Sequence, residues 1–61
     1  MTLTSEQKKK FCDGYIQGLE MEAFRNEFLK ALNPDKTKEL QAEIDKLKKA
    51  VADANSFQAT L

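Results

Sequence analysis

The sequence contains no His and no Trp, and it has a single Cys and a single Pro. Without His, the chain lacks the side chain that most often exchanges protons near neutral pH and most often binds metals. A lone Cys12 can form neither a disulfide within the chain nor a zinc site built from several cysteines. We therefore expect no metal, no cofactor and no catalytic residue, and we expect a reducing compartment, the cytoplasm.

Long apolar runs and an excess of charge of one sign are also missing. No stretch approaches the roughly 20 apolar residues that a membrane-spanning helix requires, and Lys8–Lys10 are not followed by the apolar segment of a signal peptide. Ten basic residues balance ten acidic ones. No net charge therefore draws the chain toward nucleic acid or an anionic membrane, and we expect a protein partner instead.

Charged residues make up 33% of the 61 positions and apolar residues 41%. With so little Pro and Gly, this composition favours one all-α domain spanning residues 1–61. A chain of this length buries only about 60% of the surface that it exposes when unfolded. We therefore expect one small core, which oligomerisation often supplements in proteins of this size.

A capping box predicts the start of the first helix. Thr4 is followed three residues later by Gln7, a pattern in which each side chain accepts a hydrogen bond from the other residue's backbone N–H. The helix should therefore begin near Ser5. Apolar residues then recur every three or four positions, as one buried stripe requires. They are Phe11, Cys12, Tyr15, Ile16 and Leu19.

A second apolar series follows, comprising Met21, Phe24, Phe28, Leu29, Ala31 and Leu32. Because a helix turns by about 100° per residue, four of these residues, Met21, Phe24, Phe28 and Leu32, are centred about 180° away from the first series. One straight helix would then bury opposite faces in its two halves. We therefore predict a break at residues 18–20, between helices over about residues 5–17 and 20–32. The alternative is one continuous helix with packing partners on both sides.

The segment Asn33-Pro34-Asp35 predicts a turn, since Asn suits both the end of one helix and the cap of the next, Pro the first helical position and Asp the positive N-terminus. A third helix should follow over about residues 34–58, and whether residues 55–61 extend it is left open. Its apolar residues alternate in spacing between four and three, as in a coiled coil. The three elements predict a small three-helix domain with a long, coiled-coil-like C-terminal helix.

These heptads also predict self-association, with a homodimer favoured. In a parallel coiled coil, Glu43 of one chain would meet Lys48 of the other. The residues expected in this interface are Leu40, Ile44, Leu47, Val51, Glu43 and Lys48. Packing within the chain would use the same apolar stripe, so the fold and the dimer compete for it.

No side chain stands out as a catalyst. Cys12 lies among apolar residues and has no His to activate it, so we interpret it as a small core or core-edge residue. Glu39 and Glu43 lie four apart on one helix face, but neighbouring Lys residues indicate an ordinary charged surface. We expect a protein without enzymatic activity.

The aromatic residues are most simply explained as the core of such a small domain. They are Phe11, Tyr15, Phe24, Phe28 and Phe57. The alternative is an exposed surface for a partner, for which the side chains beyond the regular heptads are the most available. The residues expected at that surface are Tyr15, Glu22, Arg25, Phe57 and Leu61.

Residues 3–16 begin with Leu3-Thr4, continue with Gln7 and the Lys8–Lys10 run, and reach Phe11, Asp13 and Tyr15. This stretch resembles the opening of phage terminase small subunits, which implies a phage-like or bacterial origin. One extra residue precedes Phe11, and the Ala-rich helix that follows in that family is missing here. The resemblance therefore assigns DNA contact to no residue of this chain.

We hypothesise a small non-enzymatic interaction module, a regulator or inhibitor that binds a protein partner through its helices. One alternative is a helix-turn-helix-like nucleic-acid-binding accessory that uses Lys8–Lys10. Its reading helix would present Glu20 and Glu22 to the phosphate backbone, which would repel them. The other alternative is a structural assembly component.

Overall fold

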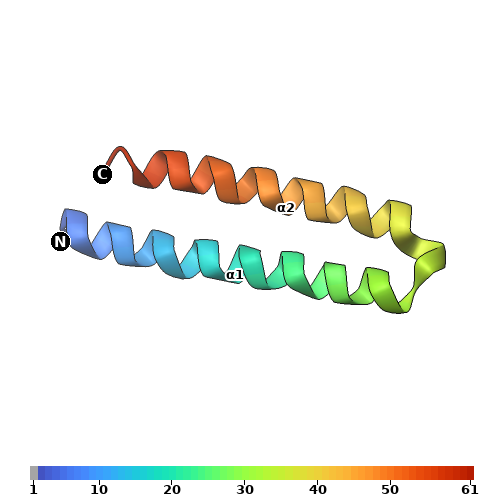
Figure 1. Ribbon diagram of the computed structural model, residues 1–61. Helices are drawn as coiled ribbons and strands as arrows, with labels where there is room; N and C mark the ends of the chain where they lie inside the picture. The colour runs from blue at the N-terminus through green and yellow to red at the C-terminus, as the bar shows by residue number, and fades with distance from the viewer. Residues whose placement is uncertain (1) are drawn as a thin grey trace.

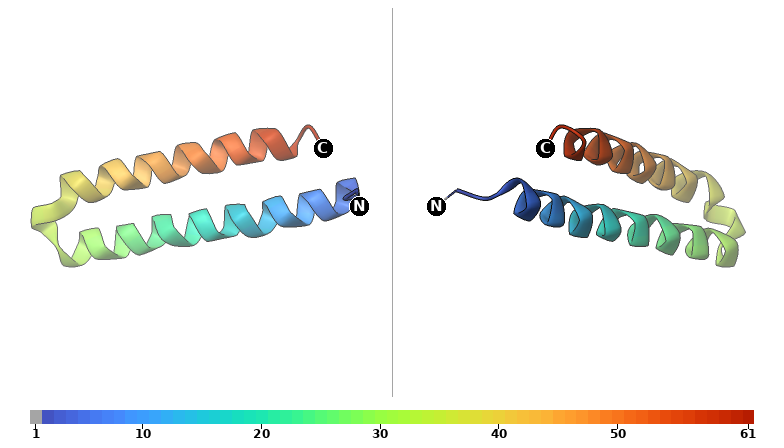
Figure 2. Two further views of the ribbon diagram at one scale, coloured as in Figure 1. Left: turned by 180° about the vertical axis from the view of Figure 1, so that it is seen from behind. Right: turned by 60° about the vertical axis from the view of Figure 1, so that its left-hand side comes forward.

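The chain folds as a helical hairpin in a computed structural model that describes residues 2–61. Helix α1 spans Ser5–Leu32, a short 3₁₀ helix η1 spans Pro34–Lys36, and helix α2 spans Thr37–Gln58. The two long helices run antiparallel, with both chain ends at the same end of the molecule (Figure 1). They stay side by side in every view (Figure 2), in a body measuring 49 × 15 × 15 Å.

The all-α class is confirmed, but the three-helix prediction is wrong. Residues 5–32 form one continuous helix, without the break expected at residues 18–20. Neither glycine adopts a positive φ, and a glycine inside a helix costs only about 1 kcal/mol relative to Ala. Breaking the helix would cost more, because the backbone hydrogen bonds of a whole turn would need other partners. The chain instead keeps α1 intact and leaves one of its two apolar faces uncovered.

The predicted capping box is present at the start of α1. The backbone N–H of Gln7 donates to Thr4 Oγ1 at 3.1 Å, and the backbone N–H of Thr4 donates to Gln7 Oε1 at 2.9 Å. Both bonds satisfy donors that have no partner within the helix. The helix therefore starts at Ser5, as predicted.

The turn at Asn33-Pro34-Asp35 is also confirmed, with one difference in its hydrogen bonding. The side-chain amide of Asn33 donates to the Leu29 carbonyl at 2.9 Å, so it closes α1 and does not cap the following helix. Pro34 occupies the first position of η1, and the Thr37 hydroxyl donates to its carbonyl at 2.7 Å. These contacts reverse the chain over few residues.

The core is a single seam between α1 and α2. At its centre, Ile16 is 7% exposed and Ile44 only 1% exposed. Ten of the half-buried residues, together with the two isoleucines, alternate in spacing between four and three on both helices, as in an antiparallel coiled coil. We call this set, with the two isoleucines, the inner seam: Cys12, Leu19, Ala23, Asn26 and Lys30 on α1, and Leu40, Leu47, Val51, Ala54 and Gln58 on α2.

Side-chain hydrogen bonds close the inner seam at both ends. At the open end, the Gln58 amide donates to Asp13 Oδ1 at 2.6 Å and to the Lys9 carbonyl at 3.0 Å. Near the turn, Lys30 Nζ donates to Gln41 Oε1 at 2.6 Å, linking α1 to α2. The bonds of Gln58 are exposed and that of Lys30 is partly buried. Each adds only a modest free energy, but together they link the two helices in one register.

The C-terminal helix ends at Gln58, and residues 59–60 form a turn in which the Thr60 hydroxyl donates to the Phe57 carbonyl at 2.6 Å. This result confirms the predicted end near residue 58 and settles the question left open for residues 55–61. Within residues 2–61, neither helix is both long and apolar enough to cross a lipid bilayer.

Candidate protein-interaction surfaces

The aromatic side chains are exposed on the hairpin surface, so the expectation that they form the core is wrong. The exposed fractions of the five rings range from 55% for Phe28 to 72% for Phe11. The reason is geometric: a two-helix hairpin buries only the narrow strip where the helices meet, and that strip is occupied by smaller aliphatic residues. The exposed rings lie in two separate places.

The first is a pocket of about 400 Å³ between the two helices toward the open end of the hairpin. We call it the terminal pocket. Its walls are Phe11, Cys12, Tyr15, Asp53, Ala54 and Phe57. The rings of Phe11 and Tyr15 stack on one another, with centroids 6.5 Å apart and planes inclined by 22°. This packing of successive turns of α1 gives the pocket one flat aromatic wall.

The chemistry of the terminal pocket favours an apolar ligand group. Cys12 is half-buried at its floor, which confirms its interpretation as a core-edge residue. Asp53 is the charged member of the lining and is exposed to solvent. An apolar side chain could therefore enter between the rings while a basic group beside it met the Asp53 carboxylate.

The second exposed set lies on the side of α1 that faces away from α2. We call it the outer row, and it consists of Met21, Phe24, Phe28 and Leu32. Their exposed fractions lie between 55% and 71%. Isolated apolar residues on a surface need no explanation, but contiguous ones indicate an interaction site. The outer row spans three turns of one helix, so it qualifies as a contiguous patch.

The residues predicted for partner binding separate in space. Tyr15 and Phe57, from different helices, meet in the terminal pocket. Glu22 and Arg25 are exposed further along α1, beyond that pocket. Leu61 is half-buried at the end of the chain, where its backbone N–H donates to the Gln58 carbonyl at 3.1 Å.

The residues predicted for self-association lie mainly inside the hairpin. Leu40, Ile44, Leu47 and Val51 all belong to the inner seam and pack against α1. Glu43 is exposed, and Lys48 lines a small hollow of about 230 Å³ with Glu20, Ala23 and Val51. In this structure α1 covers the apolar stripe of α2 that the predicted parallel dimer would need for its interface.

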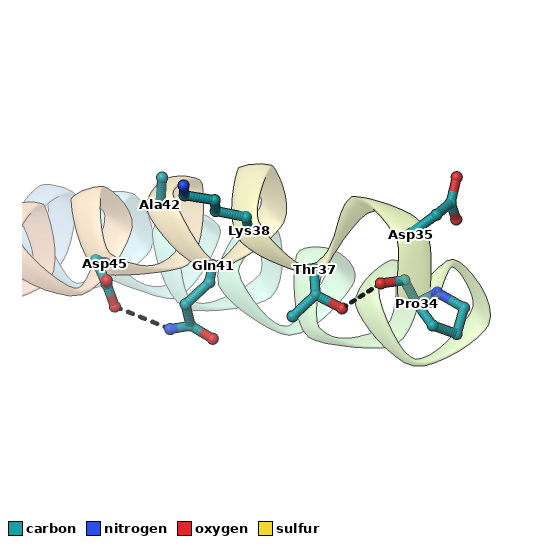
Figure 3. Close-up of a pocket in the computed structure, with 7 residues that line it drawn as sticks. All are labelled: Pro34, Asp35, Thr37, Lys38, Gln41, Ala42 and Asp45. Carbon is teal, nitrogen blue, oxygen red and sulfur yellow. Dashed lines mark hydrogen bonds between the residues drawn. The ribbon is translucent and has the colours of Figure 1, made fainter.

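A third hollow, of about 610 Å³, lies beside the turn (Figure 3). Its polar groups already bond one another: the Thr37 hydroxyl donates to the Pro34 carbonyl, and the Gln41 amide donates to Asp45 Oδ1 at 2.9 Å. The Asp35 carboxylate points away from these groups. Since these bonds stabilise the turn, we assign this hollow a structural role.

Acidic and sulfur-containing side chains do not converge in the part of the chain that the structure describes, where no group of three could hold a metal ion. Lys8, Lys9 and Lys10 are all exposed, and successive residues on a helix point about 100° apart. They therefore surround α1 near its start instead of forming one basic face.

Comparisons of the chain with protein-family models, with curated proteins and with solved structures found no match. The resemblance of residues 3–16 to terminase small subunits therefore has no support outside those residues. Any functional assignment must come from the geometry of the hairpin itself.

The residues expected at a partner surface did not include four of the six that line the terminal pocket: Phe11, Cys12, Asp53 and Ala54. The outer row was recognised as an apolar series, but its exposure was not predicted. A signal for the outer row was present in the spacing. Met21, Phe28 and Leu32 each follow an inner-seam position by two residues, which places them about 200° around α1 from that seam. An unbroken helix with such a pattern has two apolar faces.

Proposed function

We propose that this chain is a small non-enzymatic protein-interaction module, a regulator or inhibitor of phage or bacterial type. It binds a protein partner through the terminal pocket. The single observation that carries the proposal is the exposure of three rings around one pocket: Phe11 at 72%, Tyr15 at 59% and Phe57 at 61%. Interfaces are enriched in such rings, which contribute much of the binding free energy when a partner covers them.

The lining of the pocket defines the partner. An aromatic or branched aliphatic side chain would fill the space between the stacked pair on α1 and Phe57 on α2. A Lys or Arg beside it would lie near Asp53 at the pocket edge. We further propose that binding takes place in the cytoplasm, because the single thiol has no disulfide partner within the chain.

Affinity capture from the cells of origin, with a matched pair of variants, tests this proposal. Phe57→Ala removes one wall of the terminal pocket, whereas Phe24→Ala removes an equally exposed ring from the outer row. We expect a specific protein to be recovered with the wild type and with Phe24→Ala, and to be lost with Phe57→Ala.

The affinity of each variant for the purified partner then gives the size of the loss caused by Phe57→Ala. A central ring at an interface typically contributes about 2 kcal/mol or more, so Phe57→Ala should weaken the affinity on the order of 30-fold or more. Recovery of no specific protein, or of one that binds Phe57→Ala as tightly as the wild type, would contradict the proposal.

A further inference from the structure

We propose that the outer face of α1 is a self-association surface, on which a second copy of the chain packs antiparallel, α1 against α1. This inference concerns different side chains from those of the terminal pocket. The proposed function and the dimer can therefore fail independently of one another. The reasons to place a second copy on this face are its spacing, its area and its shape.

Three residues of the outer row, Met21, Phe28 and Leu32, belong to a longer coiled-coil pattern, which Phe24 flanks. This pattern includes Arg25 between Met21 and Phe28, and it continues toward the start of α1 through Gly18 and Gly14. We call the extended set the outer seam: Gly14, Gly18, Met21, Arg25, Phe28 and Leu32. The intervals between these positions alternate between four and three residues, as in the inner seam. Each outer-seam position follows an inner-seam position of α1 by two residues. The same helix therefore presents two coiled-coil surfaces on nearly opposite sides, and α2 covers only one of them.

The exposed area is sufficient for a dimer. The outer row is between 55% and 71% exposed, and a large side chain can bury roughly 200 Å². The four side chains then offer roughly 500 Å² per chain, or roughly 1,000 Å² over two chains, which reaches the lower limit for a specific interface. A hairpin with two buried isoleucines also has little core of its own, and proteins of this size commonly gain stability by oligomerising.

The shape of the outer seam favours a second copy over an unrelated helix. Its first half is hollow: a Cβ atom added at Gly14 or Gly18 would meet nothing within 4 Å, and a depression of about 470 Å³ lies beside them. Its second half is bulky, with Phe28 and Leu32. A surface with one hollow and one bulky half is complementary to itself when a two-fold axis reverses the second copy.

One antiparallel register pairs a small residue with a large one at each end of the overlap. In it, Gly18 lies opposite Phe28 of the second copy, and Gly14 lies opposite Leu32 of the second copy. Met21 then lies opposite Arg25 near the two-fold axis. The symmetry repeats each of these pairs on the other side of the axis.

Charge is consistent with the same register. Arg25 lies within the seam, where an unpaired guanidinium would be costly to bury. Glu22 is one turn away, and the antiparallel arrangement brings Glu22 of the second copy within reach of it. Two carboxylates and two guanidinium groups at the axis then leave the centre of the interface neutral.

Sedimentation of the full chain tests the proposal, with circular dichroism as a check on folding. We expect the wild type to reach twice the mass of one chain at about 100 μM, with thermal stability that rises with concentration. Gly18→Leu is the decisive variant. It adds apolar surface to a position with free space in the single chain, but it would collide with Phe28 of the second copy.

If shape complementarity drives the dimer, Gly18→Leu should weaken association on the order of 10- to 100-fold while helicity is retained. If the face is merely apolar, the added leucine should strengthen association, and the proposed register is wrong. The exchange variant G18F/F28G restores a large residue opposite a small one and should recover the dimer. A single chain that stays monomeric at all concentrations, or self-association that survives both Gly18→Leu and Phe28→Ala, would overturn the proposal.

Discussion

The two helices of the hairpin differ in the number of their apolar faces. α2 has one apolar stripe along its length, and apart from the exposed ring of Phe57 near its end, the remaining surface carries charges such as Lys46, Lys49 and Asp53. α1 has the inner seam on one side and exposed rings on the others. A helix with one apolar face needs one neighbour, and the hairpin supplies it. A helix with several needs more neighbours than this chain contains.

Because the two helices differ in this way, the residues that stabilise the hairpin can be distinguished from those that are available to a binding partner. The inner seam holds the chain together, because it contains Ile16 and Ile44, the two buried side chains within residues 2–61. The outer row and the exposed rings of the terminal pocket contribute little to packing within the single chain, yet they expose large apolar groups, which lowers solubility. Substitutions in the inner seam should therefore lower the stability of the single chain, whereas substitutions on the outer face of α1 should mainly affect association.

The largest effect is expected in the inner seam. Ile44→Ala removes the most buried side chain and should lower the free energy of unfolding by about 2–5 kcal/mol, close to the whole stability of so small a domain. Phe24→Ala, on the outer face, should change it by less than about 0.5 kcal/mol. Urea unfolding followed by circular dichroism, at a dilution where chains do not associate, measures both. Similar losses in the two variants would refute the distinction between the faces.

Exchanges between glycine and alanine on the two faces of α1 should show the same difference, with smaller changes in stability. Gly18→Ala, on the outer face, should raise the stability of the single chain by up to about 1 kcal/mol, because the added methyl group meets no other atom. Ala23→Gly, in the inner seam, should lower it by at least about 1 kcal/mol through lost helix propensity and lost packing. Thermal unfolding of dilute samples compares them. A destabilised Gly18→Ala would indicate a constraint within the chain at that position.

The smallest effect is expected at the open end of the hairpin. Gln58→Ala removes the hydrogen bonds to Asp13 and to the Lys9 carbonyl, and should cost about 0.5–1 kcal/mol. Gln17→Ala, at an exposed position of α1, serves as the control and should cost almost nothing. Amide hydrogen exchange near residues 9–13 should also become faster in Gln58→Ala. Unchanged exchange would mean that Gln58 does not fasten the helix ends.

Local signals in the sequence predicted some of the helix boundaries, but the predicted start of the C-terminal helix at residue 34 lies before the start of α2 at Thr37, because Pro34–Lys36 form η1. Thr4 with Gln7 predicted the start of α1, Pro34 predicted the turn, and the heptads from Leu40 onward predicted the buried face of α2. These features act over one or two helical turns, so they depend little on the rest of the fold. The structure confirms each of them.

The continuity of α1 could not be predicted in the same way. A break at residues 18–20 follows from the apolar pattern only if the chain itself buries every apolar series on its helices. The hairpin does not meet that condition, because Met21 and Phe28 remain exposed. The apolar pattern correctly indicates two apolar faces on this helix. It contains no information on whether the same chain buries both of them.

The terminal pocket could be predicted only in part, because it forms between two helices and depends on how they are aligned. Tyr15 and Phe57 were singled out, but their meeting in one pocket depends on the register of two antiparallel helices. That register is set by the length of the turn after Asn33 and by contacts such as Gln58 with Asp13. Spacing along a single helix carries no information about the residue opposite it.

The hairpin geometry has a practical consequence for labelling. Both ends of the chain lie at one extremity of a body 49 Å long, on the side of the terminal pocket, while residues 33–36 occupy the other extremity (Figure 1). A fluorophore attached to the exposed side chain of Lys36, without any change in the length of the turn, would leave the rings of the terminal pocket unobstructed. The same addition joined to either terminus would crowd them, and could be mistaken for an inactivating mutation.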